Sequence, residues 1–129
     1  MNYVGVVLLS HSYDLVKGLE ALLKQIQPDV PLSVAGGTES GEIGTDVFQI
    51  KKAIESVMNP KGVVILFDLG SALINAELAI EMLGNNKDIR LADAPLVEGA
   101  YAAIIQSGCG SSIEEVIKAA EGAKALNKL

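Results

Sequence analysis

The feature that most constrains the fold is a set of short apolar runs in which hydrophobic residues do not alternate with polar ones. The two longest are YVGVVLL at 3–9 and the start of GVVILFDLG at 62–70, and shorter ones lie at 32–35 and 89–92. Strands that are apolar on both faces are typical of a parallel sheet covered by helices on both sides. We therefore expect each run to be a buried strand.

Helical patterns separate these runs. Apolar residues recur with helical spacing over 15–26, 47–57 and 72–83, and a further helix is expected at 96–106 before a last one near the C-terminal end. Strands that alternate with helices are joined by crossover connections, and such connections produce parallel strands.

The expected fold is therefore a single α/β domain spanning residues 1–129, with an open, mainly parallel four-stranded sheet in the order 2-1-3-4 and helices on both faces. Thr45 and Asp46 are suited to begin the helix that follows them, and Ser71 is suited to cap the next one.

Composition excludes several classes of protein. Half of the 129 residues are hydrophobic, which is enough for one core and excludes a disordered chain. The net charge of −6 and an aromatic content of 4% leave no basic patch or stacking platform, so we expect no nucleic-acid partner.

The numbers of cysteine and histidine residues indicate whether the chain can bind zinc and in which compartment it is expected. Cys109 and His11 are each the only residue of their type, so neither an internal disulfide nor a zinc site is expected, and a cytoplasmic location follows. The first apolar run is broken by Gly5 and ends at Leu9, short of the roughly 18 residues of a membrane span. We expect neither a signal peptide nor contact with a membrane.

Polar segments follow three of the expected strands, at the sheet edge where ligands bind in open α/β folds. In the order 2-1-3 the first and third strands are neighbours, which brings His11 and Asp68 together. A carboxylate that accepts the Nδ1 proton leaves Nε2 of the imidazole free to act as a nucleophile. The alternative is structural: His11 bonded locally and Asp68 capping a helix.

A glycine-rich segment, GGTESGEIGTD at 36–46, follows the second strand. Its glycines allow backbone N–H groups to converge on an anion, but they are equally suited to a flexible turn. Neither GxxxxGK[ST] nor GxGxxG is present, which argues against those modes of nucleotide binding.

The three polar segments contain no Lys or Arg, so an anion there would depend on backbone N–H groups and hydroxyls. The candidate hydroxyls belong to Ser10, Ser12, Thr38, Thr45 and Ser71. Such a site suits transient carriage of a phosphoryl group better than tight storage. Cys109 is either a thiol nucleophile or, as we expect, a small packing residue between helices.

Three motifs together resemble one family. LLSHS with His11, AGGTESGEIGTD and DLGSA are similar to the phosphoryl-donor subunit of phosphotransferase-system-dependent dihydroxyacetone kinase, within the mannose-type enzyme IIA superfamily. The resemblance spans essentially the whole chain. It implies that His11 accepts a phosphoryl group on Nε2 from the phosphocarrier HPr, beside Asp68, and passes it to ADP bound on a partner subunit.

The resemblance also implies a phosphoryl-binding set, partners and an assembly. The set is Ser12, Gly37, Thr38, Gly44, Thr45, Gly70 and Ser71. No cofactor or metal is expected on this chain; ADP and Mg are expected on the partner subunit. Members form homodimers, and some fuse an HPr-like domain for which 129 residues leave no room, so HPr is expected as a separate protein.

Two other functions remain open. A mannose-type IIA protein would donate instead to a sugar-specific IIB protein, although such relatives carry a longer glycine-rich sequence with a proline where this chain has the compact DLGSA. A non-catalytic regulatory α/β module would use His11 and Asp68 only structurally.

Overall fold

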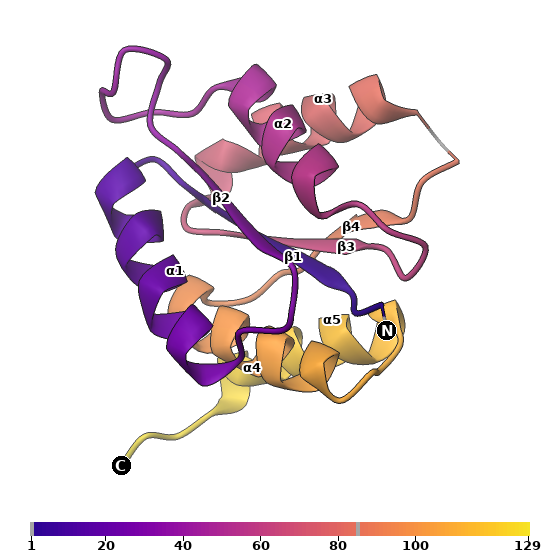
Figure 1. Ribbon diagram of the computed structural model, residues 1–129. Helices are drawn as coiled ribbons and strands as arrows, with labels where there is room; N and C mark the ends of the chain where they lie inside the picture. The colour runs from indigo at the N-terminus through magenta and orange to yellow at the C-terminus, as the bar shows by residue number, and fades with distance from the viewer. Residues whose placement is uncertain (1, 85) are drawn as a thin grey trace.

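In the computed structural model, which describes residues 2–84 and 86–129, one sheet lies between two layers of helices (Figure 1). The strands are β1 (Gly5–Ser10), β2 (Leu32–Gly36), β3 (Val63–Phe67) and β4 (Ile89–Leu91). All neighbouring pairs are parallel, and the order is β2-β1-β3-β4. The predicted fold class and strand order are confirmed.

The helices divide between the two faces of the sheet, as Figure 1 shows. One layer holds α1 (Tyr13–Ile26), α4 (Leu96–Gly108) and α5 (Ile113–Gly122), and the other holds α2 (Val47–Val57) and α3 (Leu73–Leu83). Two short 3-10 helices, η1 (Gly70–Ala72) and η2 (Ala123–Ala125), precede α3 and follow α5. Over the described residues, no helix combines the length and the hydropathy that a membrane crossing requires.

Side chains of β1 point alternately to the two faces of the sheet and contribute to two separate hydrophobic cores. Val6 and Leu8 pack with the layer of α1, α4 and α5, whereas Val7 and Leu9 pack with α2 and α3. Because side chains alternate between the faces of a strand, the next residue, Ser10, belongs to the α1 side. His11, one residue later, is on the α3 side.

The helix starts agree with the sequence in one case and differ in another. The Asp46 side chain caps α2 by accepting hydrogen bonds from the N–H groups of Phe48 and Gln49 at 2.8 and 3.2 Å, as predicted. The prediction that Ser71 caps α3 is wrong. Ser71 lies inside η1, which runs directly into α3, so α3 begins without a side-chain cap.

The expectation for Cys109 is also wrong. Its side chain is exposed and does not pack between helices. The reason is that α4 runs two residues beyond its predicted end, to Gly108, so that Cys109 becomes its C-terminal cap.

Gly36, at the end of β2, allows α1 to approach the sheet. A Cβ atom there would lie 2.8 Å from Tyr13 Cα and 2.9 Å from the Ser12 carbonyl oxygen, both of them backbone atoms. We expect Gly36→Ala to lower the free energy of unfolding by about 1–3 kcal/mol, because the start of α1 must move away.

Gly18→Ala is the matched control, because a Cβ at this position inside α1 meets nothing within 4 Å. This change should raise the free energy of unfolding by about 0.5–1 kcal/mol through helix propensity. Urea denaturation of both variants checks the pair. Equal effects of the same sign would contradict the close approach at Gly36.

Candidate functional site

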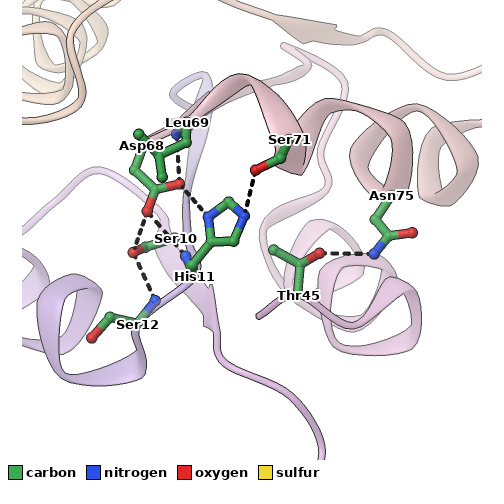
Figure 2. Close-up of polar contacts among 8 residues, drawn as sticks. All are labelled: Ser10, His11, Ser12, Thr45, Asp68, Leu69, Ser71 and Asn75. Atoms are coloured by element: carbon green, nitrogen blue, oxygen red, sulfur yellow. Dashed lines mark hydrogen bonds and ion pairs between the residues drawn. The ribbon is translucent and has the colours of Figure 1, made fainter. Parts of the chain in front are cut away.

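The site lies where the carboxyl ends of β1 and β3 meet. Leu9 pairs with Phe67, and the Asp68 N–H donates to the Leu9 carbonyl at 3.1 Å, which continues the pairing past the end of β3. His11 and Asp68 consequently face each other, with 3.0 Å between Nδ1 and Oδ1, although they are 57 residues apart (Figure 2).

Asp68 is held by four donors. Oδ1 accepts from His11 Nδ1 and, at 2.7 Å, from the Leu69 N–H. Oδ2 accepts from the Ser10 hydroxyl at 2.8 Å and from the His11 N–H at 3.0 Å. Partial burial raises the pKa of this carboxyl, but the hydrogen bonds from His11, Ser10 and Leu69 outweigh burial and hold the pKa below its ordinary value. Asp68 is therefore ionised at neutral pH.

An ionised carboxylate only accepts hydrogen bonds, so the proton between the two side chains belongs to His11 Nδ1. In the neutral ring Nε2 then has a free lone pair. Nε2 lies 2.8 Å from the hydroxyl of the exposed Ser71, which donates to it (Figure 2). The His11 side chain is 19% exposed; Asp68 anchors the ring at Nδ1, and the exposed Ser71 faces it at Nε2.

The glycine-rich segment closes on itself and attaches to His11. The Thr38 N–H donates to the Glu42 carbonyl at 2.8 Å, and the Glu42 N–H donates to Thr38 Oγ1 at 3.1 Å. Gly44 donates its N–H to the His11 carbonyl at 2.9 Å. Gly37 has a φ of +77°, the left-handed region that glycine tolerates best. With Gly41 bonded to Thr38 as well, four of the segment's N–H groups already have acceptors in the protein.

Asn75, which the sequence analysis did not identify, joins this segment to α3. Its Nδ2 donates to Thr45 Oγ1 at 2.8 Å (Figure 2). The available signal was its position, since Asn75 follows Ser71 by one helical turn in an otherwise mostly apolar stretch. Such spacing places both residues on the same side of the helical segment formed by η1 and α3.

The remaining residues of the expected set lie around this centre. Ser12 Oγ caps α1 by accepting from the Leu15 N–H at 3.4 Å, and Gly70 begins η1. Among the described residues, only Asp68 and Ser71 form hydrogen bonds with the His11 ring. Ser10 was expected to offer its hydroxyl to an anion, and this is wrong because the side chain is fully buried.

Asp68 makes stability depend on pH. Its pKa in the folded protein lies below the ordinary value of 3.8, so the ionised carboxylate stabilises the fold above that value and loses this effect as the pH falls through the folded-state pKa. Asp68→Asn should therefore lower the free energy of unfolding by about 1–3 kcal/mol near neutral pH, and the difference from wild type should close below a pH of about 4.

Denaturation at a series of pH values checks this dependence. Asp29→Asn serves as the control, since the Asp29 side chain is exposed and forms no hydrogen bond within the described part of the chain. A difference for Asp68→Asn that stayed constant from neutral to acid pH would contradict the role of its charge.

Comparison with known proteins identifies the family to which the chain belongs. A family model described as PTS system fructose IIA component, of the EIIA-man type, matches residues 5–118. The chain is 47% identical to the phosphoryl donor subunit DhaM of PEP-dependent dihydroxyacetone kinase 1 from Listeria innocua, over 79% of this chain and 80% of that protein. It is 36% identical to the phosphotransferase subunit DhaM of the PTS-dependent dihydroxyacetone kinase from Lactococcus lactis, over 90% and 91% of the two chains.

Solved structures extend the likeness to the fold. A crystal structure of a protein of unknown function superposes with a TM-score of 0.82 at 31% identity, covering 95% of each chain. The match of the family model over most of the chain, together with these relatives, shows that the chain belongs to the EIIA-man family of the phosphotransferase system, in its DhaM-type branch.

Proposed function

We propose that this chain is a phosphohistidine carrier: His11 takes a phosphoryl group from HPr and passes it to ADP bound on a partner subunit of dihydroxyacetone kinase. The observation that carries the proposal is the state of the His11 ring, whose Nδ1 is fixed by Asp68 and whose Nε2 lies beside an exposed hydroxyl. The names of the relatives, phosphoryl donor subunits of dihydroxyacetone kinase, support the same role.

The transfer requires little covalent chemistry from the protein. The Nε2 lone pair attacks phosphorus as the bond from phosphorus to the ring nitrogen of the donor's phosphohistidine breaks, and that nitrogen keeps the electron pair. Positive charge then builds on the His11 ring. Asp68 stabilises this charge through Nδ1, in the way that a buried carboxylate steadies an imidazolium in other enzymes.

Ser71 has to move before the attack, because its hydroxyl lies 2.8 Å from Nε2, where phosphorus must arrive. The side chain is exposed, so rotation about its χ1 bond is open to it. Once rotated, the hydroxyl is in position to donate to a phosphoryl oxygen.

We propose that a set of residues around His11 binds the oxygens of the phosphoryl group. This set comprises Ser12, Gly37, Thr38, Gly44, Thr45, Gly70 and Ser71. The first N–H groups of α1 and η1 have no partner within their own helices, which suits them to donate to phosphoryl oxygens.

Positive charge for the onward step comes from the partner. The lining of a hollow beside the site includes Asp14, Glu39 and Glu42, and among the described residues no Lys or Arg contributes to it. Mg bound with ADP on the partner subunit would supply the compensating positive charge, while a terminal oxygen of ADP attacks phosphorus and Nε2 keeps the electron pair of the bond that breaks. We further propose that the protein is a homodimer and that it is cytoplasmic, so that HPr and the kinase subunits can bind it there.

His11→Ala should abolish phosphoryl uptake from charged HPr, because no other side chain offers a comparable nitrogen. Asp68→Ala should slow uptake by about 10²-fold while the domain stays folded, because the charge that develops on the ring loses its partner. Intact mass, followed by mapping of an acid-labile phosphoryl group, measures both effects.

Cys109→Ala is the control for this experiment. Cys109 is exposed and lies two residues after Ser107, whose hydroxyl donates to the carbonyl of Val4 just before β1. Cys109 is therefore at the opposite end of the sheet from His11. This variant should take up phosphoryl groups at the wild-type rate. An acid-labile phosphoryl group on the His11→Ala protein would refute the assignment.

The acceptor needs its own test, because the description of the matching family model names a sugar component and thereby favours a second candidate, donation to a sugar-specific IIB protein. We expect the charged protein to lose its phosphoryl group to an ADP-loaded dihydroxyacetone kinase subunit, with formation of ATP, and to keep it in the presence of a IIB domain. Discharge by the IIB domain alone would establish the second candidate. Failure to charge at all with phosphoenolpyruvate, enzyme I and HPr would favour a non-catalytic module.

A further inference from the structure

Ser10 occupies an unusual place for a polar side chain. It is the last residue of β1 and is 0% exposed, and the other fully buried polar residue within the described ranges is Ser107. A buried hydroxyl costs free energy unless it is hydrogen-bonded. The Ser10 hydroxyl is bonded on both sides.

The direction of these two hydrogen bonds is fixed. Ser10 Oγ lies 2.8 Å from Asp68 Oδ2 and 3.0 Å from the backbone nitrogen of Ser12 (Figure 2). An ionised carboxylate has no proton to give, so the Ser10 hydroxyl donates to Asp68 and accepts from the Ser12 N–H. A continuous chain of hydrogen bonds thus leads from the start of α1 through Ser10 to Asp68 and, from its other oxygen, to the His11 ring.

We infer that Ser10 is a positioning residue for phosphoryl transfer, which orients the Asp68 carboxylate and thereby keeps the proton of the His11 ring on Nδ1. This inference rests on the proposed function. Within the described part of the chain, Ser10 is the only side-chain donor on Oδ2, since the other donor there is the His11 backbone N–H. Its bond to the Ser12 N–H also links the carboxylate to the start of α1.

The position of the proton matters for the reaction. If the carboxylate rotates away, the neutral ring is free to carry its proton on Nε2, and in that tautomer Nε2 has no lone pair with which to attack phosphorus. In metal sites that contain a carboxylate–histidine pair, mutation of a residue that orients the pair typically lowers activity or metal affinity by about 10- to 100-fold.

Ser107 provides a matched control. Its hydroxyl is equally buried and donates to the Val4 carbonyl at 2.6 Å, in front of β1 and away from His11. Ser107→Ala therefore removes one buried, hydrogen-bonded hydroxyl without touching the site. A purely structural role for Ser10 predicts that both alanine variants behave alike.

The test compares Ser10→Ala, Ser10→Thr and Ser107→Ala by two measurements. The first is the rate of phosphoryl uptake from charged HPr. The second is the ¹⁵N spectrum of the uncharged, histidine-labelled protein, which reports on one residue because His11 is the only histidine. We expect Ser10→Ala to slow uptake about tenfold and to move both ring signals away from the Nδ1–H pattern.

Ser107→Ala should match the wild type in both measurements, and Ser10→Thr should restore the wild-type spectrum by restoring the hydroxyl. If Ser10→Ala is too unstable to study, Ser10→Cys replaces it with a weaker donor of similar size, and we expect the same changes at smaller amplitude. Wild-type uptake and an unchanged spectrum in the Ala or Cys variant would overturn the inference. If the wild-type protein itself does not charge, the proposed function fails, and the spectrum alone then decides whether Ser10 holds the Asp68–His11 pair.

Discussion

The hydrogen bond between His11 Nδ1 and Asp68 Oδ1 is the contact on which the rest of the site depends. It joins the ends of two parallel strands that are neighbours in the sheet although α1, β2 and α2 lie between them in the chain. Several further contacts at this edge of the sheet are made to His11 or Asp68. Ser10 and Leu69 hold the carboxylate, Ser71 faces the free ring nitrogen, and Gly44 holds the His11 carbonyl.

Much of this arrangement follows from the sequence. Apolar runs without alternation identify the strands, and the rule that ligands bind beyond the carboxyl ends of parallel strands directs attention to His11 and Asp68. The order in which β1 lies beside β3 then makes their proximity a consequence of topology. Asp46 was predictable for a different reason, since a side chain that caps its own helix needs no distant partner.

The sequence failed where a polar side chain had a choice of partner. Ser71 has the residue type of a cap, but its hydroxyl bonds to a histidine 60 residues away. Ser10 has the residue type of a surface anion ligand, but strand alternation turns it toward α1 and burial commits it to Asp68. Asn75, in α3, donates a hydrogen bond to Thr45, which precedes α2 and lies 30 residues earlier in the chain. Local propensity carries no information about such partners, which tertiary packing selects.

The electrostatics of the site bear on how firmly it would hold a phosphoryl group. A phosphoryl group brings about two negative charges at neutral pH, and here it would sit across one imidazole ring from an ionised carboxylate. The lining of the adjoining hollow includes Asp14, Glu39 and Glu42, and it contains no lysine or arginine in the ranges that the structure describes. Neutral donors such as Ser71 offset only part of this repulsion, since hydrogen bonds between neutral groups and an anion are weaker than those from cations. A phosphorylated state at His11 would thus have a higher free energy than one held by a cationic clamp, and this would favour release to an acceptor whose bound metal ion brings positive charge.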